Sequence, residues 1–220
     1  MADSLNRYLV VPSSGKGTGV LVLHPWWGLN DFIRSLCDRL AQTGFVALAP
    51  DLFSGKVAQT IAEAEQLVTH LDWEREVAPK VQSAVEELHK QPEITGSRLG
   101  IVGLSFGAFW ALWLAQKYPD LIRAVTLFYG TNGGGGDFQQ SKAAFLGHFA
   151  ETDPYETKED IQALEKNLKG ADRPTTFYTY AGTGHWFFEN DRPDAYDASA
   201  AQLAWERTVT FLHKQLVEKR

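Results

Sequence analysis

The amino-acid sequence predicts an α/β protein in which helices cover both faces of a mostly parallel sheet. Short, nearly continuous apolar runs recur along the chain, which is typical of strands that are buried on both faces. Segments with the apolar spacing of helices separate most of these runs, and this alternation favours right-handed crossovers between parallel strands. The chain has 220 residues, of which 44% are hydrophobic and 22% are charged. These values indicate one globular domain over residues 1–220 and exclude wholesale disorder or a fibrous repeat.

Seven segments are predicted to form strands, because each is short and rich in apolar or β-branched residues. They are residues 7–11, 19–24, 45–48, 99–104, 124–129, 144–149 and 176–180. In an open parallel sheet, ligands bind at loops beyond the carboxyl ends of the strands. We therefore expect the functional side chains directly after these segments.

Six segments are predicted to be helical from the spacing of their apolar residues. They are residues 32–40, 62–71, 77–88, 106–118, 161–168 and 203–216. The fourth segment is apolar almost all round, which predicts a buried helix. Residues 99–115 carry no charge, but this run is shorter than a membrane span and contains three glycines, so it favours a strand, a turn and a helix.

Composition and charge argue against several partners and cofactors. The chain has 27 acidic residues against 21 lysines and arginines, and no dense basic cluster, so we expect no nucleic-acid partner. Cys37 is the only cysteine, which excludes an intramolecular disulfide and a cysteine-based zinc site. The N-terminal residues do not resemble a signal peptide. We therefore expect a cytoplasmic protein, a monomer or small homo-oligomer, with no membrane association.

Residues 103–107 read Gly-Leu-Ser-Phe-Gly, a G-x-S-x-G element between a predicted strand and a predicted helix. A nucleophile elbow requires that context, because its serine sits on a strained turn with the hydroxyl exposed. Gly103 and Gly107 would leave room where the backbones of strand and helix crowd together. The element therefore predicts Ser105 as a nucleophile. The alternative is a tight glycine-rich turn with an inert serine.

A serine nucleophile needs a base, and His185 is the best candidate among six histidines. It lies in a loop of small residues directly after the predicted strand 176–180. Three other histidines fall in charged helical segments, and His148 falls inside a predicted strand, where a structural role is the simpler interpretation. The alternative for His185 itself is a loop histidine without a catalytic role.

The acid that orients such a base is expected after another strand, between the serine and the histidine. Asp153 follows the predicted strand 144–149 and meets this condition. Glu151 is a competing candidate, and Asp172 is less suitable because it precedes a strand. The order Ser105, Asp153, His185 is that of α/β hydrolases and differs from the orders in chymotrypsin and subtilisin.

An oxyanion hole needs two backbone N–H groups near the nucleophile. Phe106 supplies one, as the first residue of the predicted helix. The loop after the second strand supplies the other, and since Pro25 has no N–H, Trp26 is the expected donor and Trp27 the alternative. We expect Trp27, Trp186 and Phe187 to line an aromatic substrate pocket, although packing against the sheet is the alternative for each.

With these residues in place, the chain resembles the dienelactone hydrolase family. The segments that carry the resemblance are residues 26–30, 40–41, 44–53, 103–107, 147–153, 180–188, 196 and 204–208. The resemblance implies an α/β-hydrolase fold with a sheet of about seven or eight strands. Since 220 residues are scarcely more than the core of this fold needs, we expect no large lid. It also implies the triad Ser105, Asp153 and His185, with oxyanion donors at Trp26 and Phe106.

Two features depart from the family pattern. The best-known members use a cysteine nucleophile held by a glutamate in the early loop, whereas this chain has Ser105 and Pro25 at those positions. Typical members bind the substrate carboxylate with arginines. No arginine occurs between Asp51 and Leu71, where one is expected, and Glu189 takes the place of the other.

The sequence thus predicts a serine hydrolase that cleaves a small to medium carboxylic ester or lactone through an acyl-enzyme intermediate. No metal or organic cofactor is expected, because this chemistry needs none and no cluster of metal ligands occurs. One alternative is an acyltransferase or peptidase that uses the same triad. The other is a non-catalytic binding protein with this fold, against which the intact set of serine, histidine and acid argues.

Overall fold

The computed structural model describes residues 6–216, which contain one seven-stranded sheet. Its strands are β1 (Arg7–Val10), β2 (Gly17–Leu23), β3 (Phe45–Pro50), β4 (Ile94–Leu104), β5 (Ile122–Phe128), β6 (Ala144–Ala150) and β7 (Thr175–Tyr180). The helices are α1 (Asp31–Gln42), α2 (Ile61–Thr69), the π-helical turn η1 (Trp73–Val77), α3 (Ala78–Lys90), α4 (Phe106–Lys117), the short turn η2 (Asn132–Gly134), α5 (Lys158–Gly170) and α6 (Ala198–Leu216).

The strands lie in the order β1-β3-β2-β4-β5-β6-β7. Only β1 runs antiparallel to its neighbour, and the other pairs are parallel. After the edge strand β1, the chain forms β2, continues to β3 between β1 and β2, and then returns to place β4 on the other side of β2. This reversal makes the β2/β4 boundary the topological switch point, where open α/β sheets bind their ligands. Leu23 and Gly103 pair at that boundary, so the loops after both strands leave the sheet side by side.

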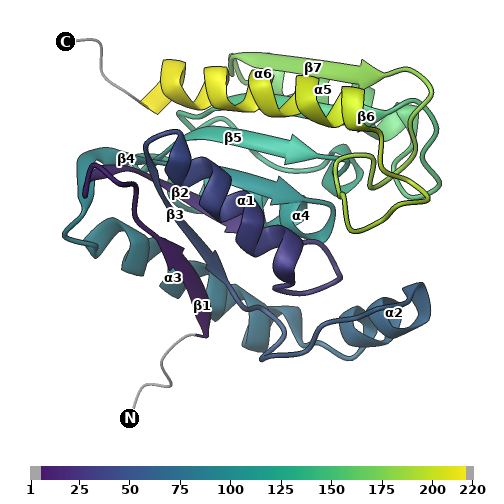
Figure 1. Ribbon diagram of the computed structural model, residues 1–220. Coiled ribbons are helices and arrows are strands. Elements are labelled where there is room, and N and C mark those ends of the chain that lie inside the picture. The colour runs from purple at the N-terminus through teal and green to yellow at the C-terminus, as the bar shows by residue number, and fades with distance from the viewer. Residues whose placement is uncertain (1–5, 217–220) are drawn as a thin grey trace.

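Helices cover both faces of the sheet (Figure 1). Apolar side chains of α1 and α6 form one buried cluster with one face of the strands. Side chains of α3, α4 and α5 form a second cluster with the opposite face. The residues of β2, β3 and β6 are buried throughout, which explains their continuous apolar runs. Full burial of one such side chain contributes about 1.5–3 kcal/mol.

Polar side chains determine where three helices begin. Asn30 accepts the Ile33 N–H at 3.1 Å at the start of α1. Thr60 and Glu63 form a reciprocal capping box at α2, and Thr157 caps α5. Each cap satisfies a backbone donor that the first helical turn leaves without a partner. These caps fix where the loops that follow β2, β3 and β6 join their helices.

The predicted mostly parallel sheet with helices on both faces is confirmed, and seven strands lie within the predicted number. The uncharged run 99–115 forms the end of β4, a turn and α4, as expected. The structure differs at β4, which begins five residues earlier than predicted, at Ile94. Residues 95–98 are exposed and polar, so an apolar pattern could not mark them.

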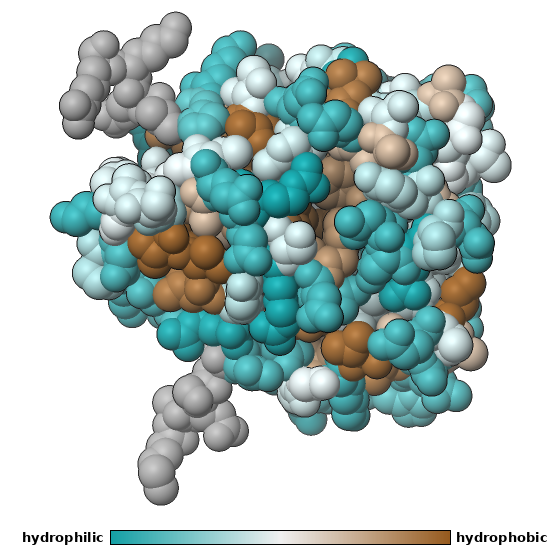
Figure 2. All heavy atoms as spheres, in the orientation of Figure 1, coloured by the Kyte–Doolittle hydropathy of each residue, from teal (hydrophilic) through white to brown (hydrophobic). Residues whose placement is uncertain are grey.

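The surface in the orientation of Figure 1 is largely hydrophilic, and apolar residues form small separate patches on it (Figure 2). Among residues 6–216, we find no helix with the length and apolar character that a membrane span requires.

Candidate active site

Ser105 lies on the tight turn that joins β4 to α4. Its backbone has φ 49° and ψ −113°, a conformation that residues with a side chain rarely adopt. Close packing requires glycine two residues before and two residues after this serine. A Cβ atom on Gly103 would lie 2.5 Å from the Gly107 oxygen, and one on Gly107 would lie 2.1 Å from the Leu23 oxygen. The two glycines therefore allow β2, β4 and α4 to meet around a strained serine, as an elbow requires.

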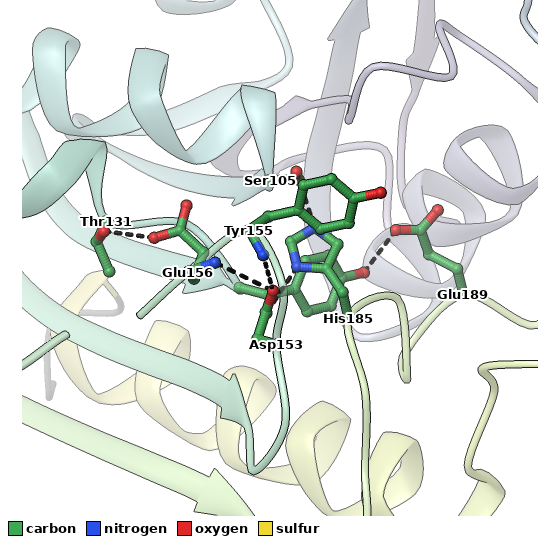
Figure 3. A network of polar contacts seen from close by, with 8 residues as sticks. Ser105, Thr131, Asp153, Tyr155, Glu156, His185 and Glu189 are labelled. Atoms are coloured by element: carbon green, nitrogen blue, oxygen red, sulfur yellow. Dashed lines mark hydrogen bonds and ion pairs between the residues drawn. The ribbon is translucent and has the colours of Figure 1, made fainter. Parts of the chain in front are cut away.

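The structure brings His185 to Ser105 across 80 residues of sequence. The Nε2 atom of His185 lies 3.1 Å from Ser105 Oγ, and its Nδ1 atom lies 2.7 Å from Asp153 Oδ2 (Figure 3). The side chains of His185 and Asp153 are each 3% exposed. A carboxylate on Nδ1 selects the tautomer in which Nδ1 carries the proton and Nε2 is free to accept one.

The backbone of the loop after β6 orients the Asp153 carboxylate. Its Oδ1 atom accepts the N–H groups of Tyr155 at 2.9 Å and Glu156 at 3.1 Å, so Oδ2 faces His185. The competing acid Glu151 is exposed, and its carboxylate instead accepts the Gly182 N–H at 2.9 Å. The geometry therefore singles out Asp153 as the partner of the histidine.

Two further carboxyl groups flank the triad on opposite sides (Figure 3). Glu156 bonds to the Thr131 hydroxyl, and burial raises its pKa to about 7. Glu189 is fully buried and accepts the Tyr129 hydroxyl at 2.7 Å, while burial raises its pKa to about 8. The Tyr129 ring also packs against the His185 ring, with 4.7 Å between centroids. Neither contact could be predicted from local sequence, because each joins segments that lie far apart along the chain.

The two proposed oxyanion donors lie on the loops that meet at the switch point. Phe106 is the first residue of α4, so its N–H has no acceptor within the helix. Trp26 lies three residues beyond the end of β2, and its N–H makes no hydrogen bond within residues 6–216. Gly107 packs against the backbone oxygens of Leu23 and His24, which places the Trp26 loop against the elbow.

Aromatic side chains surround the histidine, but not all in the way that the sequence predicts. Trp186 and the exposed Tyr155 contact the His185 ring, with centroids 5.2 and 4.9 Å away, and Trp26 contacts both. Tyr155 was not predicted, although it lies two residues after Asp153, because the sequence does not show which way its side chain turns.

Two pocket predictions require correction. Phe187 is fully buried in the core cluster beside α1 and α6, so its side chain does not reach a solvent-accessible pocket. Trp27 is 2% exposed and packs behind Trp26 and Trp186, so it supports the aromatic wall from inside. An aromatic residue that follows a strand can face the core or the site, and local sequence does not distinguish the two.

A pocket of about 540 Å³ lies between α2 and the loop after β3. Phe53 lines this pocket and also contacts the Phe106 ring, with 5.5 Å between centroids. In residues 6–216, no group of three or more histidine, cysteine, aspartate or glutamate side chains is arranged to hold a metal ion.

The fold and the Ser105–His185–Asp153 arrangement define the chain as an α/β hydrolase in structure. It belongs to the dienelactone hydrolase family, whose model matches residues 5–216.

Two relatives illustrate this membership, and one solved structure shows the shared fold. The chain is 33% identical to "Protein usf" of Aquifex pyrophilus, over 95% of this chain and 93% of that protein. It is 32% identical to a Bradyrhizobium protein named "Probable 2-oxo-3-(5-oxofuran-2-ylidene)propanoate lactonase", over 99% of this chain and 92% of that one. Among solved structures, a dienelactone hydrolase-like promiscuous phosphotriesterase from metagenomic libraries has a TM-score of 0.82 at 24% identity, covering 93% of this chain and 89% of its own.

Proposed function

We propose that this protein is a serine hydrolase that cleaves carboxylic esters or lactones through an acyl-enzyme. The observation that carries the proposal is the position of the His185 ring, which lies 3.1 Å from the Ser105 hydroxyl on one side and 2.7 Å from the Asp153 carboxylate on the other. The strained backbone of Ser105 supports the same conclusion, because such strain persists only where surrounding structure imposes it. Family membership and the name of the lactonase relative add support.

Acylation begins when Ser105 Oγ attacks the carbonyl carbon and His185 Nε2 takes the hydroxyl proton. The Asp153 carboxylate stabilises the resulting imidazolium through Nδ1. The carbonyl oxygen becomes an oxyanion, which accepts the N–H groups of Phe106 and Trp26. Collapse of this intermediate breaks the bond to the alkoxy oxygen, which receives the proton from Nε2. With a lactone, that oxygen stays attached to the acyl group on the serine.

Deacylation repeats the same proton transfers with water as the nucleophile. Water loses a proton to His185 Nε2 as it attacks the acyl carbon, and the second oxyanion is held by the same two N–H groups. When this intermediate collapses, the proton on Nε2 returns to Ser105 Oγ. The carboxylic acid leaves, and the triad regains its initial protonation.

The surroundings of the triad favour neutral substrates over substrates that carry a carboxylate. Trp26, Trp186 and Tyr155 form the aromatic wall, and the acids Glu156 and Glu189 lie on either side of the triad. Glu189 stands where typical family members carry an arginine, so this position offers no positive charge to a substrate carboxylate. We therefore expect small neutral esters or lactones to be better substrates than their carboxylate-bearing analogues.

The test compares p-nitrophenyl acetate hydrolysis by wild type, Ser105→Ala and the control Ser83→Ala, whose serine is exposed on α3. Loss of the nucleophile should lower kcat by on the order of 10⁴-fold or more, whereas the control should retain wild-type rates. Wild type should also react with a fluorophosphonate at Ser105. Equal rates for wild type and Ser105→Ala in purified samples would overturn the proposal. Product analysis with added alcohol separates hydrolysis from acyl transfer.

A further inference from the structure

His24 is a fully buried histidine directly before the loop that carries Trp26. Both of its ring nitrogens have backbone partners. The Leu52 N–H points to Nε2 at 3.1 Å, and Nδ1 lies 2.7 Å from the Pro25 oxygen. Because an N–H donor requires a lone pair, Nε2 must be unprotonated. Nδ1 therefore carries the proton and donates it to the Pro25 carbonyl.

That carbonyl belongs to the same peptide unit as the Trp26 N–H. A trans peptide is planar, so its C=O and N–H point in opposite directions within one rigid plane. Fixing the Pro25 oxygen therefore fixes the direction of the Trp26 N–H. The Gly28 N–H donates to the same oxygen at 3.2 Å, so two donors hold the plane from the side opposite Trp26 N–H.

A second loop holds the imidazole in place. The Asp51 carboxylate accepts the N–H groups of Phe53, at 3.0 Å, and Gly55, which shapes the turn after β3 that presents the Leu52 N–H. The Phe53 ring packs edge-on against His24, with 4.8 Å between centroids. Burial lowers the pKa of His24 to about 4, so the ring is neutral at ordinary pH and can accept from Leu52.

We propose that His24 is a positioning residue that aims the Trp26 N–H at the oxyanion through the Pro25 carbonyl. The inference rests on the proposed function, because it assigns Trp26 the role of oxyanion donor. His24 does not touch the substrate. It acts through one peptide plane, so its loss should affect the transition state more than substrate binding.

Two substitutions separate the two hydrogen bonds of the ring. In His24→Asn, the side-chain amide can reach the position of Nδ1 and donate to Pro25, but it is too short to reach Leu52. In His24→Gln, the longer amide can reach the position of Nε2 and accept from Leu52, but the donor to Pro25 is lost. A role limited to packing predicts similar losses for both variants.

The proposal predicts a selective loss of kcat in H24Q. Since complete removal of an oxyanion donor costs about 10²–10³-fold, misdirecting one should lower kcat by about 10–100-fold with little change in KM. H24N should keep kcat at least about tenfold above that of H24Q. Thermal unfolding, measured for both, shows whether either variant fails to fold. Equal kcat values in two folded variants, or a loss that appears in KM alone, would overturn the inference.

The nitrogen chemical shifts of His24 in ¹⁵N-labelled wild type give a test that does not depend on turnover. A neutral ring with the proton on Nδ1 is expected between pH 6 and 8. A proton on Nε2, or a charged ring, would overturn the inference even if the protein hydrolyses esters. Conversely, if the protein shows the expected tautomer but does not hydrolyse esters, the proposed function is contradicted, whereas the hydrogen bond from His24 to the Pro25 oxygen is supported.

Discussion

His185 and His148 occupy similar surroundings at the carboxyl half of the sheet, yet only one of them is suited to catalysis. Both are nearly or fully buried, and both ring nitrogens of each have a partner within 3.1 Å. His148 lies between the hydroxyl groups of Tyr180, at 2.8 Å, and Thr208, at 3.0 Å. His185 instead lies between a hydroxyl and the carboxylate of Asp153.

Burial and two hydrogen bonds are therefore not sufficient for a histidine to act as a general base. Neutral hydroxyls cannot compensate a charged ring, and burial lowers the pKa of His148 to about 3, so it stays neutral. A carboxylate on the far nitrogen stabilises the imidazolium that proton transfer from Ser105 would create. His148 lies inside β6, and its ring nitrogens face the hydroxyl groups of Tyr180 and Thr208.

The strongest test replaces each histidine by the same residue. His185→Leu removes the proposed base and should lower kcat for p-nitrophenyl acetate by on the order of 10⁴-fold or more. His148→Leu should leave kcat within about threefold of wild type, because this ring does not face the nucleophile. Comparable losses of kcat in the two folded variants would contradict the claim that only His185 acts as a base.

Asp153→Asn tests whether the carboxylate is what separates the two histidines. An amide at this position can donate to Nδ1 and reverse the tautomer, so kcat should fall by about 10⁴-fold although the fold is retained. Glu151→Gln is the matched control, since its exposed carboxylate contacts Gly182 and not the histidine. Kinetic measurement on both variants decides between the two acids. A larger loss of kcat in Glu151→Gln than in Asp153→Asn would show that Glu151 is the acid that orients His185.

The effect of His148→Leu should appear in stability. The substitution removes the hydrogen bonds to Tyr180 and Thr208 and leaves a buried hydroxyl without this partner, which should lower the free energy of unfolding by about 1–3 kcal/mol. Arg207 also donates to the Tyr180 hydroxyl at 3.1 Å, which limits the loss on that side. Urea denaturation provides the measurement. An unchanged unfolding midpoint would show that the two hydrogen bonds of His148 contribute nothing to stability.

Glu189→Gln should change how stability depends on pH. Burial raises the folded-state pKa of Glu189 from 4.5 to about 8, so between these values the folded state holds a proton that the unfolded state has lost. The stabilising contribution of this group is present below pH 4.5 and is lost as pH rises to about 8, by up to about 1.4 kcal/mol per pH unit.

The Gln variant retains an acceptor for the Tyr129 hydroxyl but does not titrate. Its free energy of unfolding, followed by urea denaturation between pH 5 and 8, should therefore fall less steeply than that of wild type. Parallel curves for the two proteins would mean that Glu189 is ionised in the folded state throughout this range.

Much of the fold could be predicted because its signals are local. The apolar runs of β2 and β6 and the glycines around Ser105 reflect constraints that act within a few residues. The prediction also selected three side chains that the structure brings together, and their catalytic roles remain predictions. It was wrong about Phe187, since the face to which a loop side chain turns depends on packing between distant segments.

The order of residues along the chain determined the alternating strands and helices, the elbow at Ser105 and the succession of serine, acid and histidine. Only the tertiary structure decided which partners each buried polar group meets: Asp153 rather than Glu151 for His185, and Leu52 and Pro25 for His24. The physical reason is that a hydrogen bond requires atoms within about 3 Å in a definite direction, and strand order and register alone bring such distant segments together.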